Sequence, residues 1–168
     1  RAWYGLGQTY ELLSMPHYAL YYFSKACSLR PYDGRMWGAL AGCYEALSQY
    51  RDALRCYQRS RENGEQVKSL IKMGDLYRKM GDDAQAAHFY TTCINLQQCE
   101  RDRVILGDEV EPIILLFLVK YHMRGVKPPD FEQAKMYCLR LLQQYPTFSQ
   151  RENAAQLLKD IQLYSNTQ

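Results

Sequence analysis

Few of the features that mark a membrane protein or a nucleic-acid-binding protein occur in this sequence of 168 residues. A membrane-spanning helix needs about 20 consecutive apolar residues, and the longest apolar run, Ile113 to Val119, is far shorter. There is no long run of basic residues, and the formal net charge of +3 is modest. We therefore predict no membrane contact and no nucleic acid among the partners.

Motifs that carry chemistry are also missing. The sequence contains no Gly-rich phosphate loop, no G-x-S-x-G and no H-E-x-x-H. The histidines His17, His88 and His122 lie far apart, with no carboxylate or thiol at a consistent spacing. We interpret them as helix-surface or packing residues, and we predict a protein that is not an enzyme and has no cofactor and no metal site.

The 6 cysteines form no C-x-x-C pair and no Cys/His cluster with the spacing of zinc ligands. They are Cys27, Cys43, Cys56, Cys93, Cys99 and Cys138. We interpret them as buried free thiols of a cytosolic or nuclear protein. A redox or metal role is the alternative.

The sequence contains three copies of one pattern of large and small residues. The first copy reads Trp3, Leu6, Gly7, Tyr10, Ala19, Phe23, Ala26 and Pro31. The second reads Trp37, Leu40, Ala41, Tyr44, Ala53, Tyr57 and Ser60, and the third reads Leu70, Met73, Gly74, Tyr77, Ala86, Tyr90 and Cys93. The copies recur at about 34 residues, and their spacing resembles the W-x2-L-G-x2-Y…A-x3-F…P pattern of the tetratricopeptide repeat (TPR). Each such repeat is a pair of antiparallel helices, and repeats of this kind typically hold other proteins.

The alternation of small and large residues supports this fold independently. Small residues at Gly7, Ala41 and Ala53 fall where paired helices approach most closely, and overpacking such a contact costs about 1–3 kcal/mol. Large residues such as Trp3 and Tyr10 are expected to fill the space around the contact. Apolar residues three and four apart indicate amphipathic helices and not strands.

We predict an all-α fold, a TPR superhelix (α-solenoid) of three regular and one degenerate helix-pair repeats plus a capping helix. A single domain covers residues 1–164, with repeats at about 1–33, 34–66, 67–97 and 110–146. The predicted helices cover about 1–13, 16–29, 34–47, 50–62, 66–79, 83–96, 110–123, 130–144 and, as the cap, 149–163. Residues 97–107 are interpreted as an insertion loop and 165–168 as a frayed tail.

Local signals set several of these boundaries. Pro16 suits a first helical turn, where its missing N–H costs little. Asp33 is a plausible N-cap, Gly81 ends a helix, and Asp82 or Asp83 caps the next one. The turn containing Pro128-Pro129 must be longer than usual, because Ala134 falls four residues late for the repeat pattern.

In a TPR stack, the first helix of each pair lines a concave groove through positions two, five, nine and twelve of the repeat. In the first two copies these positions hold Arg1, Tyr4, Gln8 and Glu11, then Arg35, Gly38, Gly42 and Glu45. In the third they hold Lys68, Ile71, Asp75 and Arg78, and in the fourth Pro112, Leu115, Val119 and His122. We predict protein binding by Arg1, Tyr4, Gln8, Glu11, Arg35, Glu45, Lys68, Asp75 and Arg78.

These positions predict rows of charge along the groove. Glu11 and Glu45 occupy equivalent positions, as do Arg1, Arg35 and Lys68. An acidic row beside a basic row would bind an extended peptide with charges of both signs. Gly38 and Gly42 have no side chain, so a peptide can approach that backbone closely. The alternative is that the charges are only a solvated face.

Three stretches go beyond the general pattern. They are R-A-W-Y-G-L-G-Q-T-Y-E from Arg1, M-P-x-Y-x-L-Y-Y at Met15 to Tyr22, and L-R-P-x-D-x-R-M at Leu29 to Met36. Together they resemble the subunit-eight family of the anaphase-promoting complex (the cyclosome). The resemblance is strong from Arg1 to about Gln58 and fair to Leu96.

This resemblance implies a non-catalytic scaffold in a ubiquitin ligase of cell division, located in nucleus and cytoplasm. The implied partners are other subunits of the complex and the N-terminal region of a co-activator. The family forms homodimers, which the resemblance assigns to repeats absent from this sequence. It also implies an acidic pocket for an arginine of the co-activator. From their groove positions in the best-matching repeat, we hypothesise that Glu11, with Gln8 and Tyr4, contributes to that pocket. A sister TPR subunit of the same complex is a further possibility.

A different class of TPR protein is the competing interpretation. Co-chaperone adaptors capture the C-terminal carboxylate of a heat-shock chaperone with Lys, Asn and Arg side chains in the groove. Here Lys68 and Lys72 could supply the later half of that clamp. Tyr4, Gln8 and Gly42 stand where its earlier half is needed.

Overall fold

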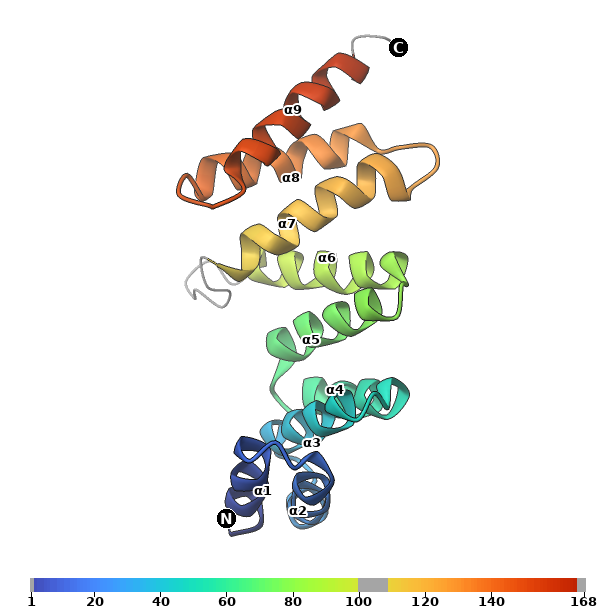
Figure 1. The fold of residues 1–168 in the computed structure, drawn as a ribbon. Coiled ribbons are helices and arrows are strands. Elements are labelled where there is room, and N and C mark those ends of the chain that lie inside the picture. Colours follow the sequence, from blue (N-terminus) through green and yellow to red (C-terminus); the bar gives the residue numbers. More distant parts are fainter. Residues whose placement is uncertain (1, 100–108, 166–168) are drawn as a thin grey trace. The chain divides into compact units, whose positions relative to one another are not determined.

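The computed structural model describes residues 2–99 and 109–165, and every described element is a helix (Figure 1). The helices are α1 (Ala2–Leu12), α2 (Pro16–Leu29), α3 (Gly34–Ala46), α4 (Tyr50–Glu62), α5 (Gln66–Lys79), α6 (Asp83–Cys99), α7 (Val110–Lys120), the π-turn η1 (Tyr121–Gly125), α8 (Phe131–Gln144) and α9 (Arg151–Ser165). The predicted all-α fold is therefore confirmed for this part of the chain.

Contacts between Cα atoms divide the chain into two compact units, Arg1–Gly81 and Asp82–Gln168. The first unit holds α1 to α5 and the second holds α6 to α9. The single array over residues 1–164 stays a prediction.

In the first unit, each helix packs against the helices before and after it in the chain. The contacts join α1 to α2, α2 to α3, α3 to α4 and α4 to α5. Figure 1 shows α1 and α2 side by side at the start of this series. This order of contacts is the order that stacked helix pairs require.

Small residues lie at the closest contacts within the first unit, as the pattern predicts. Ala19, Ala41 and Ala53 have no exposed surface. A Cβ added to Gly7 would lie only 2.5 Å from Cε1 of Phe23, so α1 and α2 approach too closely there for even a methyl group. The Phe23 ring, itself fully buried, fills the space that the missing side chain leaves.

The predicted caps are confirmed where they are described. The Asp33 carboxylate accepts a hydrogen bond from the backbone N–H of Arg35 at the start of α3, and Pro16 begins α2. Gly81 follows α5 with a φ of +80°, a conformation that glycine adopts without strain. The Asp82 carboxylate then accepts from the Gln85 N–H at 3.0 Å, so Asp82 caps α6.

One expectation about the first repeat is wrong. Trp3 and Leu6 are 38% and 42% exposed and do not fill a closed core, whereas Leu40 and Leu70 at the equivalent faces of α3 and α5 are 5% and 1% exposed. The reason is that α2 and α4 cover those later faces, while no described helix precedes α1. The Trp3 ring instead lies 5.9 Å from the ring of Tyr22.

In the second unit, α6 contacts α7, α7 contacts α8, and α8 contacts α9. A buried ion pair between Glu111 of α7 and Arg140 of α8 joins two of these helices, and the Cys138 thiol donates to the backbone oxygen of Ala154. The last helix packs on α8, which is the place predicted for the capping helix.

Two predictions in the second unit need correction. The helix α6 continues to Cys99, so residues 97–99 of the predicted loop are helical, and residues 100–107 lie outside the described ones. Pro112, Leu115 and Val119 are buried and do not line a groove. The apolar residues of α7 surround its axis, and α6 and α8 both pack on it, so its face could not be assigned from periodicity.

His122 also departs from the predicted groove position. It lies in η1, half-buried between the rings of Tyr121 and Tyr137 at 5.5 and 5.8 Å, and its Nδ1 atom is buried without a hydrogen-bond partner. Burial lowers the pKa of His122 below its usual value, against the opposing charge of Asp130. His122 is therefore a packing residue.

The contact between Gly7 and Phe23 leads to a stability prediction. Gly7→Leu should lower the free energy of unfolding by at least about 1–3 kcal/mol, because its side chain would overlap the Phe23 ring. Ala53→Leu should destabilise for the same reason. Thermal unfolding followed by circular dichroism measures both effects.

Gly5→Ala is the matched control in the same helix. Nothing lies within 4 Å of a Cβ added to Gly5, and Ala favours a helix interior over Gly by about 0.5–1 kcal/mol. This variant should melt at the same temperature as the parent chain or above it. A Gly7→Leu variant that also melts unchanged would contradict the assigned register of the first repeat.

Candidate peptide-binding groove

A groove of about 530 Å³ lies within the first unit and takes its lining from α1, α3, α4 and the beginning of α5. Its lining residues are Tyr4, Glu11, Arg35, Gly38, Ala39, Gly42, Glu45, Tyr57, Ser60, Glu65, Lys68, Ser69 and Lys72. The groove therefore has the location predicted for a partner surface, along the first helices of successive pairs.

Two glycines of α3 form part of the groove surface between α1 and α5. Gly38 and Gly42 are four residues apart and so lie on one face of α3. A Cβ added to Gly42 would lie 3.9 Å from Oε1 of Glu11, which places this carboxylate beside the bare backbone of α3. A Cβ added to Gly38 would lie 3.3 Å from Oγ of Ser60. The missing side chains leave room for a ligand over α3.

One wall of the groove holds Glu45 in a network of hydrogen bonds. Its carboxylate accepts from the Tyr57 hydroxyl at 3.1 Å and forms an ion pair with Lys79 of α5. Burial alone would raise the pKa of Glu45, but the bonds from Lys79 and Tyr57 outweigh it, so the pKa is lowered. Burial, together with the neighbouring Glu45 charge, raises the pKa of Tyr57. Both charges of the Glu45–Lys79 pair are thus engaged within the protein.

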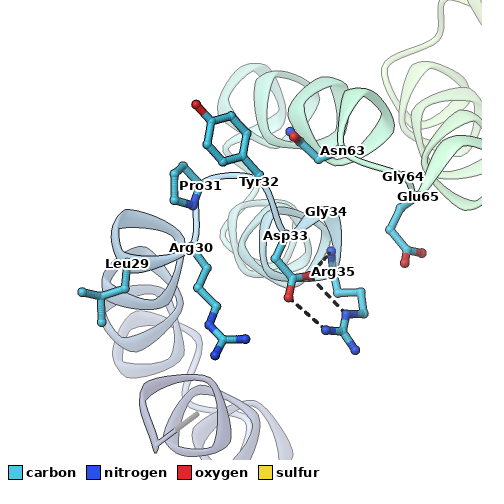
Figure 2. A pocket seen from close by; sticks show the side chains of 10 residues that line it. All are labelled: Leu29, Arg30, Pro31, Tyr32, Asp33, Gly34, Arg35, Asn63, Gly64 and Glu65. Atoms are coloured by element: carbon cyan, nitrogen blue, oxygen red, sulfur yellow. Dashed lines mark hydrogen bonds and ion pairs between the residues drawn. The ribbon is translucent and has the colours of Figure 1, made fainter.

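Arg35 is also engaged, as Figure 2 shows. Its guanidinium Nε and Nη2 donate to the two carboxylate oxygens of Asp33 at 3.1 and 2.9 Å. These bonds hold the pKa of Asp33 below its usual value. The pair borders a second pocket of about 520 Å³ at the turns before α3 and α5, where Arg30, Asn63 and Glu65 also lie (Figure 2).

Other charged side chains of the groove have no such partner. Among the described residues, the side chains of Glu11, Lys68 and Lys72 form no hydrogen bond and no ion pair. Glu11 is exposed on α1, and the two lysines are exposed on α5. These groups are available to a ligand.

The structure brings together five of the nine residues predicted to bind a partner. Tyr4, Glu11, Arg35, Glu45 and Lys68 line the groove. Gln8 lines a neighbouring pocket of about 380 Å³ instead, and Asp75 and Arg78 of α5 are not among the lining residues. Arg1 lies outside the described residues. The binding role of all nine stays a prediction.

Several lining residues were not predicted. Tyr57 and Ser60 belong to the second helix of their repeat and were assigned to packing, but the Tyr57 hydroxyl reaches Glu45, and the Ser60 hydroxyl donates to the backbone oxygen of Gly34. Lys72 was placed only in the competing interpretation. Its spacing of four residues from Lys68 is the signal that identifies it, since residues four apart share a helix face.

The cysteines whose side chains are described, Cys27, Cys43, Cys56, Cys93 and Cys138, are buried free thiols, as predicted for them. Burial raises the pKa of Cys27 to about 12 and the pKa of each of the other four to about 11. These thiols are therefore protonated at neutral pH and are weak nucleophiles. No described helix is long and apolar enough to cross a membrane.

Comparison with known families supports the repeat assignment. Family models described as tetratricopeptide repeat match residues 37–66 and residues 67–98. Residues 37–98 of the chain are therefore TPR repeats. TPR repeats form scaffolds for protein–protein interaction, and this fold typically has no catalytic role.

Solved structures of MamA are similar in fold. A crystal structure of MamA is 19% identical to this chain with a TM-score of 0.63, covering 84% of this chain and 75% of the MamA chain. A second crystal structure of MamA protein is 18% identical with a TM-score of 0.60, covering 84% and 74%. At these identities the likeness shows the fold alone. No curated protein matches the sequence at a significant level.

The Glu45 network predicts a pH dependence of stability. A carboxylate whose pKa is lowered on folding contributes stability that is present above about pH 4.5 and is lost as the pH falls through the lowered pKa. Glu45→Gln should therefore cost up to about 1 kcal/mol at pH 7, the upper range for a partly exposed ion pair, and less at pH 3. Urea unfolding at both pH values measures the difference.

Glu11→Gln is the matched control, because Glu11 is a groove carboxylate that forms no ion pair. It should leave the free energy of unfolding almost unchanged at both pH values. If Glu45→Gln cost the same at pH 3 as at pH 7, the carboxylate charge would not be the source of the stability.

Proposed function

We propose that this TPR protein is a non-catalytic scaffold whose groove in the first unit binds an extended segment of a partner protein. The observation that carries the proposal is the set of unpaired charges that line the groove beside the bare backbone of Gly38 and Gly42. Charged side chains without internal partners are available for charge-assisted hydrogen bonds to a ligand.

We further propose that the parent protein is a subunit of the anaphase-promoting complex, a ubiquitin ligase of cell division in nucleus and cytoplasm. The support is the sequence resemblance from Arg1 to about Gln58, which includes Tyr4, Glu11, Arg35 and Glu45 of the groove. The expected partners are other subunits of that complex and the N-terminal region of a co-activator.

Glu11 is the residue best placed to hold a basic side chain of such a co-activator. Its carboxylate has no partner among the described side chains and lies beside Gly42. A guanidinium can donate two parallel hydrogen bonds to one carboxylate, and this geometry favours arginine. Tyr4, half-buried against Phe23 with 5.4 Å between the ring centroids, would form a wall of the same pocket.

Glu11→Arg should weaken binding of a labelled co-activator N-terminal segment by at least tenfold, since the change replaces attraction for a basic side chain by repulsion between like charges across the interface. Fluorescence anisotropy with the full-length protein measures the affinity. Glu152→Arg on the exposed surface of α9 makes the same change of charge away from the groove and should leave the affinity unchanged. Equal affinities for the Glu11→Arg variant and the unmodified protein would contradict the proposal that Glu11 binds an arginine of the co-activator.

A second candidate function is that of a co-chaperone adaptor, because Lys68 and Lys72 both line the groove without ion pairs. Those two lysines could hold the C-terminal carboxylate of a heat-shock chaperone. Against it, Tyr4 and Gly42 occupy the part of the groove where further amide or amino donors are needed.

Affinity purification of the tagged full-length protein from mitotic cells, followed by mass spectrometry, separates the two candidates. We expect the other subunits of the anaphase-promoting complex together with a co-activator. Recovery of heat-shock chaperones without those subunits would replace the first candidate with the second.

A further inference from the structure

The groove contains as many acidic as basic side chains. Some of them already form ion pairs within the protein, and others do not. The acidic residues of the lining are Glu11, Glu45 and Glu65, and the basic ones are Arg35, Lys68 and Lys72. Glu45 is bonded to Lys79 and Arg35 to Asp33. The charges left for a ligand therefore include an acidic group on α1 and a basic pair on α5.

The basic pair is placed to act as one site. Lys68 and Lys72 lie four residues apart, so their side chains project from neighbouring turns of one face of α5. The charge of Lys72 helps to lower the pKa of the nearby Glu45 carboxylate, but this carboxylate already accepts hydrogen bonds from Lys79 and Tyr57. No other side chain of the described residues forms an ion pair with either lysine. Two ammonium groups without a partner favour an anionic group on the ligand.

The carboxylates in the same lining limit the kind of anionic ligand that can bind beside Lys68 and Lys72. A polyanion such as a nucleic acid would be repelled by Glu11, Glu45 and Glu65 in the same lining. A peptide with one acidic and one basic side chain matches both ends of the groove. The bare backbone at Gly38 and Gly42 lets the main chain of that peptide cross α3 between the two ends.

We infer that the groove selects peptides with charges of both signs, in which an acidic side chain is held by Lys68 and Lys72 while a basic side chain lies beside Glu11. This inference rests on the proposed peptide-binding function. Glu11 lies in the last turn of α1, and Lys68 and Lys72 lie in the first half of α5, so the two ends of the site stand on different helices of the groove with α3 between them in the lining.

A random peptide library displayed away from any free C-terminus tests the inference without a known ligand. We expect selection on the parent chain to enrich peptides that carry both an acidic and a basic residue at a fixed spacing. The variant Lys68→Glu/Lys72→Glu should lose the acidic preference and keep the basic one, and Glu11→Lys should do the reverse. Lys120→Glu/Lys159→Glu makes the same change of charge at exposed positions of the second unit and should enrich the same peptides as the parent.

A synthetic peptide from the selection, amidated at its C-terminus, then gives the affinity. Lys68→Glu/Lys72→Glu should weaken it at least tenfold, and replacing the acidic residue of the peptide by lysine should restore binding to that variant. Equal unfolding temperatures for variant and parent show that the fold is retained.

The outcomes separate the inference from the function on which it rests. Enrichment of peptides that show no preference for an acidic residue would overturn the inference and leave the peptide groove in place. An acidic preference that persists in the Lys68→Glu/Lys72→Glu variant would do the same. Failure to enrich any peptide would overturn both the proposed function and the inference.

Discussion

The close approach of paired helices at small residues is the constraint on which the rest of the first unit depends. At Gly7 the contact leaves no room for a methyl group against Phe23, and Ala19, Ala41 and Ala53 have no exposed surface. Helices held at this distance stack in order, each against its neighbours in the chain. The groove exists because this stacking turns the first helices of successive pairs toward one side and leaves Gly38 and Gly42 of α3 uncovered by side chains of their own.

The helices of the first unit could be predicted because each local signal agrees with the repeat pattern. Pro16, Asp33 and Gly81 stand where a helix begins or ends, and the apolar positions of the pattern face the neighbouring helix. The second unit was harder for a physical reason. A helix such as α7, with Leu115, Leu116 and Val119 all buried, has no polar face from which its orientation can be read.

The sequence predicts which charged residues lie on the groove face, but it does not predict which of them form ion pairs within the protein. The repeat register placed Glu45 and Arg35 on the groove face, but it could not show that their charges are already engaged. Lys79 binds Glu45 from 34 residues further along the chain, about one repeat length, because stacking brings equivalent turns of successive first helices together. A carboxylate and an amine one repeat apart are thus a sequence signal for a structural ion pair, and that signal can be searched for in other helix-pair arrays.

Some charges of the groove are paired within the protein and others are not. This difference explains how one groove can keep a fixed shape and still bind a ligand. Glu45, bonded to Tyr57 and Lys79, ties α3 to α4 and α5 and fixes the shape of the wall. Asp33 both caps α3 and holds Arg35, so the start of that helix is fixed as well. Among the described residues, Glu11, Lys68 and Lys72 form no such bonds, so a ligand that binds them displaces water and breaks no internal ion pair. Binding through these three groups would leave the internal pairs intact, so a partner can bind and dissociate without disturbing the packing that forms the groove.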